Sequence, residues 1–497
     1  MPAGVWPATA PAPDYKVLEV FLYGGMSCWE NFYFRDLAGT RGYRGFQTTG
    51  AALQSYLDLH FNGACAGAPS ATDVPVLFDG SDSSHRVFLA PSTRPVWGTA
   101  LFDRMRVIVL QHDLLPHEAA IPYALTGFRL GNPKLAGLGA AIQRRAIALE
   151  ELKPVATRRV IPFSYVMQPV AFFAADNLLA LTATGQHPGS SRPVVIASDS
   201  TSGVLPMLLR PNASSAGDQL FDYYRAQYRD WMRFAAAGDP VRSRGLADYQ
   251  AAAANLLIAP SLHALLSASP LTSPPAAPLC AQLSSGAFPA PSTNATHTGI
   301  RVAAHLLAEP TNPARYVGVV DSGLMQASGG GAYDSHGSGQ VPTHAVNLLN
   351  VLSTLRSLVD SGGLDLTKTL VVLTTEFGRS PFRSSGGSIS ASSNGRDHWP
   401  RGYVNVLIGG PIPSTAHKVV GRIQDGTSEA DPANGVADPA NVYNCSDVRA
   451  AVLMAAGVFP LADGLFGTTD FTASLTDPTN HDETARNIRR TILGVPD

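Results

Sequence analysis

Polar side chains that suit metal binding gather in three segments of the second half of the chain. Asp334 and His336 lie in a glycine-rich stretch, Glu376 directly follows the apolar run TLVVLTT, and Asp397 and His398 precede another apolar run. Carboxylates and imidazoles are the ligands that a borderline divalent cation such as Zn²⁺ takes. Such an ion can activate water and neutralise an anionic ester. We therefore expect a divalent metal site formed by Asp334, His336, Glu376 and His398.

Each of these segments also has a simpler structural interpretation, which the sequence leaves open. Asp334 and His336 can satisfy backbone groups within a turn, and His398 can belong to an ordinary surface turn. Glu376 can cap the next element or pair with Arg379. Two further polar residues of these segments are additional site candidates, namely His344 and Asp397.

The elements that must position these side chains read as strand, helix and strand. Apolar runs predict strands over 315–320, 369–375 and 403–408. Between the first two, leucines and a valine recur on one helical face and the pattern ends at Gly362 and Gly363. Strands that are apolar on both faces imply a parallel sheet covered on both sides. Ligands of such sheets bind beyond the carboxyl ends of the strands, where the polar segments fall.

The rest of the chain fits one α/β domain with a mainly parallel central sheet and helices on both faces. We expect a Pro/Ala-rich leader over 1–15 and a single domain over 16–497, with insertions at about 40–100 and 268–293. Further strands are expected at 16–23, which ends at Gly24-Gly25, and at 106–110, 159–163 and 193–197. Further helices are expected at 134–151, 220–237, 245–266 and 301–309.

Composition bounds the partners. Lys and Arg total 36 against 38 for Asp and Glu, so the surface lacks an overall positive field and a nucleic-acid partner is not expected. The sequence contains no run of about 18 apolar residues, so no membrane-spanning helix is predicted. The N-terminal segment lacks the basic start and apolar stretch of a secretory signal. Four widely separated cysteines permit two disulfides without requiring them.

Longer motifs resemble a known family. The run TLVVLTTEFGRSP followed by GRDHWPRGY resembles a bacterial branch of the alkaline phosphatase/sulfatase superfamily, the domain of unknown function 1501. The segments GGAYDSHG, FLYGG and HEAAIPYALTG are similar to three other motifs of this family. The resemblance covers most of the chain and is strongest from 315 to 425. It implies an alkaline phosphatase-like fold.

The resemblance also implies one metal ion instead of the two of the superfamily. A superfamily strand ends in an Asp-His pair that binds one ion, and here Glu376 and Phe377 stand at these positions, so one ligand is lost. Asp334 and His336 resemble ligands of the other ion, and His398 resembles the late histidine. Zinc is the expected ion, with calcium or manganese as alternatives.

The resemblance gives no clear nucleophile. Neither the sulfatase pattern Cys/Ser-x-Pro-x-Arg nor a phosphatase-like Ser or Thr follows the second strand, so no formylglycine is expected. Ser27 is another candidate nucleophile, and Glu30 is the acid nearest the end of the first strand. An arginine is expected to supply the charge of the missing ion. The candidate catalytic residues are His117, Glu118, Arg379 and Arg396.

Three functions remain open. The first is a metal-dependent hydrolase acting on a small anionic ester, a phosphate or a sulfate. The second is a catalytically degenerate member of the fold that serves as an exported binding or assembly protein, and the third is a metalloenzyme with other chemistry. No G-x-S-x-G elbow follows a candidate strand, which disfavours an α/β serine hydrolase. Because family members usually carry an export signal, a periplasmic or secreted location is expected. The substrate and the oligomeric state stay undetermined.

Overall fold

A computed structural model describes the framework of the chain. The residues described are 14–35, 70–129, 137–154, 157, 165–168, 194–195, 219–220, 223–224, 226–227, 230, 265, 295–310, 313–321, 323–324, 332–334, 336, 340–381, 397–414, 417–426, 431–461 and 465–496.

An eight-stranded sheet forms the centre of the described framework. In spatial order its strands are β12 (Val419–Val420), β4 (Met105–Leu110), β11 (Tyr403–Gly409), β8 (Thr369–Thr374), β1 (Lys16–Leu22), β7 (Tyr316–Asp321), β5 (Tyr165–Gln168) and β6 (Val194–Val195). All pairings are parallel except the two that β11 makes with β4 and β8. The expected α/β class and the expected placing of four strands in one mainly parallel sheet are confirmed.

The central strand β1 shows why the sheet is covered on both faces. Its sequence KVLEVFL is buried beyond its first residue. Leu18, Val20 and Leu22 join one apolar cluster, whereas Val17 and Phe21 join another on the opposite face. Because successive side chains of a strand point to opposite faces, an apolar run of this kind is stable only between two layers.

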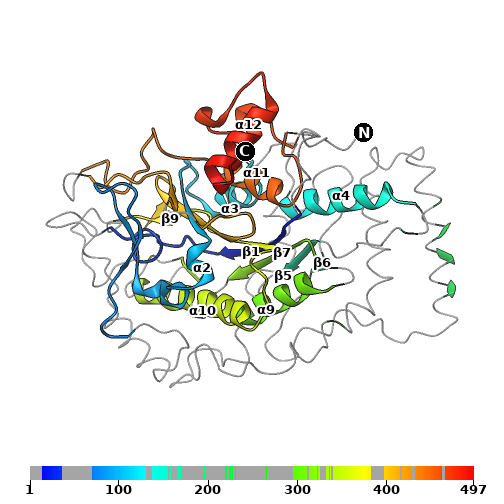
Figure 1. Cartoon of the computed structure of the whole chain (residues 1–497), viewed down its shortest axis with the longest axis horizontal. Helices are drawn as coiled ribbons and strands as arrows, with labels where there is room; N and C mark the ends of the chain where they lie inside the picture. The colour runs from blue at the N-terminus through cyan, green and yellow to red at the C-terminus, as the bar shows by residue number, and fades with distance from the viewer. Residues whose placement is uncertain are drawn as a thin grey trace.

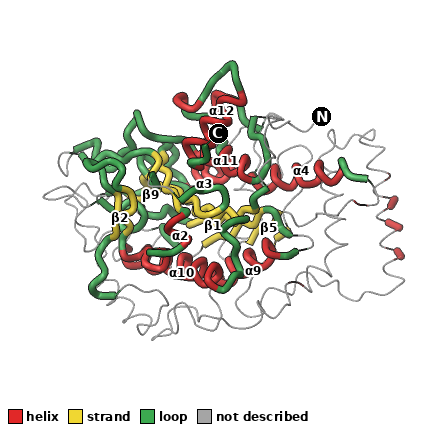
Figure 2. The backbone as a smooth tube through the Cα atoms, in the orientation of Figure 1, coloured by secondary structure: helices red, strands yellow, loops and turns green. Residues whose placement is uncertain are grey.

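Helices supply these two layers (Figure 1). One face carries α9 (Ala295–Ala308) and α10 (Gln340–Asp360), and Figure 2 shows both beneath the strands. The other face carries α3 (His117–Thr126), α4 (Leu138–Glu151), α11 (Cys445–Ala455) and α12 (His481–Ile488). Within the described residues, shorter helical segments include α2 (Ala100–Asp103), 3₁₀ turns at Pro91–Val96, Thr468–Asp470 and Ala473–Leu475, and a π turn at Arg489–Leu493.

A buried charged pair crosses from the sheet to α11. Arg449 donates to Glu19 Oε1 at 2.6 Å, and neither side chain is more than 1% exposed. Thr374 and Tyr316, from the strands beside β1, donate to the two oxygens of Glu19. The carboxylate therefore holds three sheet strands and one helix together through charge-assisted hydrogen bonds.

Part of the expected insertion at 40–100 belongs to the core. Residues 76–89 form the antiparallel pair β2 (Val76–Asp79) and β3 (Val87–Leu89), and Phe78 and Leu89 join the α10-side cluster. The strands expected at 159–163 and the excursion at 268–293 lie outside the described residues, as do most of the helices expected at 220–237 and 245–266.

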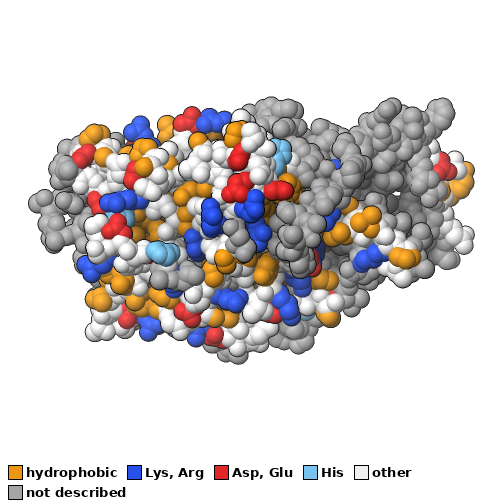
Figure 3. Space-filling model, turned by 45° about the horizontal axis from the view of Figure 1, so that its top comes forward, with side chains coloured by type: hydrophobic (Ala, Val, Ile, Leu, Met, Phe, Trp, Pro, Cys, Tyr) orange, Lys and Arg blue, Asp and Glu red, His pale blue; other side chains and the backbone are white. Residues whose placement is uncertain are grey.

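Figure 3 shows basic and acidic side chains interspersed over the described part of the visible face. Among the described residues, no helix is both long and apolar enough to cross a membrane.

Candidate metal centre

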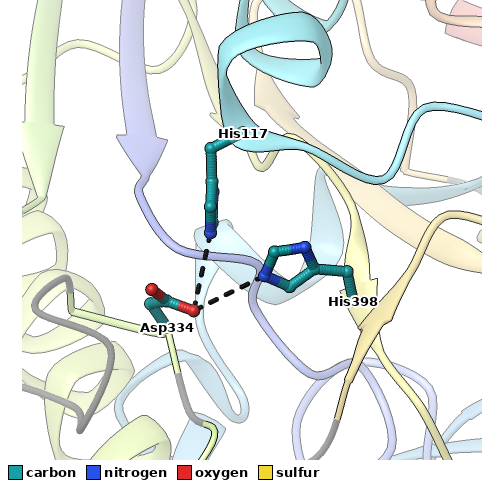
Figure 4. A group of neighbouring side chains, drawn as sticks. All are labelled: His117, Asp334 and His398. Carbon is teal, nitrogen blue, oxygen red and sulfur yellow. Dashed lines mark ion pairs between the residues drawn. The ribbon is translucent and has the colours of Figure 1, made fainter.

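Three side chains from separate elements converge at one edge of the sheet. His117 opens α3, Asp334 lies in the loop between β7 and α10, and His398 begins β10 (His398–Trp399). Their donor atoms all lie within 4.8 Å of one another (Figure 4). Asp334 Oδ1 is 3.5 Å from His117 Nε2 and 3.6 Å from His398 Nε2.

Strand direction explains the convergence. Because β11 runs antiparallel to both β4 and β8, these two strands run the same way as β1 and β7. The segments that follow all four strands therefore start at the same sheet edge. His117 follows β4, and Asp334 follows β7. His398 reaches this edge because β10 pairs with β9 (Gly378–Arg379), which follows β8.

The loop that carries Asp334 is anchored immediately before this residue. Tyr333 donates its main-chain N–H to Tyr23 O at 3.0 Å and its hydroxyl to Asp321 Oδ2 at 2.7 Å. Asp321 is the last residue of β7 and is fully buried. Burial raises the pKa of this carboxyl to about 6, against the lowering effect of its three donors. The loop is therefore tied to the ends of β1 and β7.

Hydrogen bonds fix both imidazoles so that one nitrogen faces inward. His117 Nδ1 lies 2.8 Å from Glu376 Oε1, and His398 Nδ1 lies 2.6 Å from Leu115 O. A carboxylate and a carbonyl oxygen only accept, so each Nδ1 carries a proton. The Nε2 atoms of both rings then face Asp334. Carboxylate or carbonyl support of this kind orients metal-bound histidines in proteins.

Phe377 packs against the same two rings. Its ring centroid is 4.3 Å from that of His398, nearly stacked, and 4.9 Å from that of His117. Phe377 is fully buried. The phenyl ring therefore restricts the two imidazoles without offering a ligand atom.

The charges of the site depend on one another. Burial alone would raise the pKa of Asp334, but His117, His398 and Arg379 hold it far below its usual range. Burial alone would lower the pKa of His117, but Asp334 and Glu376 raise it to about 9. Burial and Arg379 lower the pKa of His336. Asp334 is therefore an ionised carboxylate at neutral pH.

The structure brings three of the four expected ligands together. His336 Nε2 lies 3.0 Å from Asp334 Oδ1 and 3.1 Å from His398 Nε2. Its side chain is 45% exposed, the most accessible of the group. Glu376 lies elsewhere: it is fully buried, and its Oε1 faces His117 Nδ1 and the main chain of Gly24.

Arg379 is placed differently from the substrate-facing group that we expected. Its side chain is completely buried, and its guanidinium donates to Gly24 O, Gly25 O and, at 2.6 Å, to Asp334 Oδ1. Nη1 also lies 3.5 Å from His336 Nε2. The guanidinium thus contacts the carboxylate from the buried interior of the protein. Arg396 lies outside the described residues.

The remaining candidate residues are not among the three converging side chains. Ser27 Oγ donates to Glu30 Oε2 at 2.8 Å, and Ser27 N lies 3.4 Å from His344 Nδ1; all three residues are buried. Glu118 is exposed on α3, next to His117. Asp397 is 56% exposed, with Oδ1 4.0 Å from His336 Nδ1.

Sequence reasoning placed His117 among catalytic groups and did not expect it as a ligand. The signal that could have found it is its position at a helix start after an apolar strand. That strand ends at the same edge only because β11 reverses direction between β4 and β8. The carbonyl of Leu115, which accepts from His398 Nδ1, belongs to the main chain, so no residue type in the sequence could have indicated this contact.

Comparison with known proteins identifies one relationship. No curated protein and no solved structure matches the chain. Residues 295–453 match the family model described as "Protein of unknown function (DUF1501)". The matched segment includes Asp334, Glu376 and His398, whereas His117 precedes it. The chain is therefore similar to this family of unknown function over the segment that supplies two of the three converging side chains.

Proposed function

We propose that this chain is a metal-dependent hydrolase of an anionic ester, a phosphate or a sulfate, with one ion held by His117, Asp334 and His398. The observation that carries the proposal is the inward orientation of the two Nε2 atoms toward one carboxylate oxygen. An alkaline phosphatase-like fold is part of the proposal, supported by the mainly parallel sheet with the site at its carboxyl edge.

The spacing of the donor atoms fits zinc. Two ligands that each lie about 2.1 Å from a tetrahedral ion are about 3.4 Å apart. The two separations from Asp334 Oδ1 are 3.5 Å and 3.6 Å, and all three donor atoms lie within 4.8 Å of one another. Three protein ligands leave one position for water or substrate, as in catalytic zinc sites. Manganese and calcium are the alternatives, although two imidazoles favour zinc over calcium.

The protein groups around the ion would divide the remaining work. When bound, the ion would lower the pKa of a water molecule and polarise the ester. Arg379 donates a hydrogen bond to Asp334 and so fixes its carboxylate, and Phe377 restricts the imidazoles. His336 is accessible and lies beside Asp334, so its ring can contact an anionic group and exchange a proton with it. The nucleophile is then water, since Ser27 is buried and bonded to Glu30.

A second candidate is a binding protein of the same fold without catalysis. Arg379 Nη2 already lies 2.6 Å from Asp334 Oδ1 and neutralises it. A carboxylate that is paired with a buried guanidinium can be a purely structural group. This candidate differs from the first in one measurable property, because it requires no metal ion.

The test is metal content together with turnover. The full chain is purified without chelator, its zinc, manganese, calcium and iron are measured by mass spectrometry, and p-nitrophenyl phosphate and p-nitrophenyl sulfate are assayed with each ion. We expect about one zinc per chain and a turnover that chelation abolishes and zinc restores. Asp334→Asn should lose both. A chain that binds zinc in the low-micromolar range or tighter with no turnover of either ester would contradict the hydrolase, and one that binds no ion would favour the second candidate.

A further inference from the structure

Glu376 has a contact pattern that differs from that of a metal ligand. A single oxygen, Oε1, accepts from the main-chain N–H of Gly24 and from His117 Nδ1, both at 2.8 Å. The other oxygen lies 3.3 Å from Thr375 Oγ1. The residue is 0% exposed. The carboxylate is therefore directed at the outer nitrogen of a ligand, not at the space where the three ligand atoms meet.

The turn after β1 connects this contact to the opposite side of the site. Gly24 donates its N–H to Glu376, while the carbonyl oxygens of Gly24 and Gly25 accept from Arg379. Arg379 in turn donates to Asp334. One two-residue turn thus supports a buried anion that contacts His117 and a buried cation that contacts Asp334.

We propose that Glu376 is a positioning residue of the metal centre, which holds His117 with Nδ1 protonated and Nε2 directed at the ion. The inference rests on the proposed function, since it assumes that an ion binds at His117, Asp334 and His398. It assigns to Glu376 a role in orienting a ligand instead of a place among the ligands.

The carboxylate has two separable effects on the ion. As an acceptor it fixes the orientation of the ring, and as an anion it makes the imidazole a stronger donor to the metal. Gln at this position keeps an acceptor oxygen for His117 and Gly24, and its amide can donate to Thr375 Oγ1. Glu376→Gln therefore removes the charge alone, whereas Glu376→Ala removes the charge and the acceptor.

The primary test is zinc affinity, measured on the full chain by competition with a chromophoric chelator. Supporting partners of metal-bound histidines are typically worth about 10- to 100-fold in affinity. We expect a loss of about tenfold for Glu376→Gln and about 100-fold for Glu376→Ala. Glu483→Gln, a substitution of the same type on the distant helix α12, should bind zinc as the parent does. Thermal unfolding checks that each variant is folded.

A double-substitution cycle distinguishes orientation from ligation. If Glu376 acts through His117, then Glu376→Gln should have little further effect on the residual zinc affinity of the His117→Ala chain. If Glu376 is itself a ligand, its substitution should weaken the His117→Ala chain about as much as it weakens the parent, which would overturn the proposal.

A readout on the metal-free protein keeps this inference distinct from the proposed function. In ¹H–¹⁵N spectra of histidine-labelled protein, the Nδ1 proton of His117 should exchange slowly in the parent and be lost to fast exchange in Glu376→Ala. If that signal behaves as expected but no zinc binds, the proposed function fails while the contact stands. If the signal is the same in Glu376→Ala as in the parent, the positioning role is wrong.

Discussion

The main chain of Gly24 lies against the main chain of Asp334 with no room for a side chain between them. A Cβ atom on Gly24 would lie 2.3 Å from the main-chain nitrogen of Asp334, and the φ of Gly24 is +109°. Beside this contact, Tyr333 donates to Tyr23 O. The turn after β1 therefore fits the Asp334 loop only with glycine at position 24.

Gly24→Ala is accordingly expected to disturb both stability and the proposed metal site. The new methyl group meets backbone, which cannot move aside as a flexible side chain does, and overpacking typically costs about 1–3 kcal/mol in addition to backbone strain. We expect a lower urea midpoint and a zinc affinity reduced by at least about tenfold.

Gly98→Ala is the matched control for this substitution. Gly98 also has a positive φ, of +64°, but a Cβ there meets nothing within 4 Å. It should cost only the strain of a left-handed alanine, about 1–2 kcal/mol, and leave zinc affinity unchanged. Equal zinc affinity in the two alanine variants would show that the close contact does not position Asp334.

Histidine substitutions test the ligand set directly. His117→Ala and His398→Ala should each weaken zinc binding by at least about 100-fold, because each removes an inward-facing Nε2 and not only its supporting partner. His336→Ala should weaken it less, because His336 Nε2 lies 3.0 Å from Asp334 Oδ1 but His336 is not one of the three proposed ligands. Titration calorimetry gives the affinities.

The control for this series is His481→Ala, on the exposed first turn of α12. It should bind zinc as the parent does, and all four variants should retain the parental circular dichroism spectrum. Parental zinc affinity in both His117→Ala and His398→Ala would remove the ligand assignment.

The sheet and the edge that carries the candidate site could be predicted from the sequence because their signals are local. The apolar runs at β7 and β8 and the helical pattern of α10 identify a parallel unit, and the polar segments follow the strands. Topology then brings segments far apart in the chain to one edge. Asp334 and His398 approach each other in this way.

The division of labour within the site could not be predicted in the same way. Glu376 follows a strand just as a ligand would, and only side-chain direction shows that it contacts His117. Arginine is a residue type that is mostly exposed, yet Arg379 is fully buried because the carbonyls of Gly24 and Gly25 and the carboxylate of Asp334 surround its guanidinium. Such placements depend on contacts between segments more than 40 residues apart.

Removing one partner of the buried pair formed by Glu19 and Arg449 should strongly destabilise the fold. Arg449→Ala leaves a buried carboxylate without its cation, which typically costs about 3–5 kcal/mol. Urea unfolding should show this loss. As a matched control, Arg486→Ala removes an exposed pair with Glu483, in which the side chains are 48% and 38% exposed, and should cost less than about 1 kcal/mol. Similar losses in both variants would mean that the buried pair contributes no more than a surface one.

His297 is one of several buried histidines that make the stability of the chain sensitive to acid; His85 and His112 also have pKa values that burial lowers to about 4. Burial, with a smaller effect of Arg301, lowers the pKa of His297 from 6.5 to about 4, and its Nδ1 lies 3.0 Å from Thr354 Oγ1. The folded chain thus keeps this imidazole neutral where the unfolded chain takes up a proton, so the contribution is complete above pH 6.5 and is lost as the pH falls toward 4. The loss reaches about 3 kcal/mol.

Asp321 and Asp447, whose pKa values burial raises to about 6, change stability in the opposite direction over part of this range, so the test compares His297→Gln with the parent. The unfolding free energy of the variant should rise relative to that of the parent as the pH falls from 6.5 to 4. A difference that is independent of pH would show that the pKa of His297 is the same in the folded and the unfolded chain.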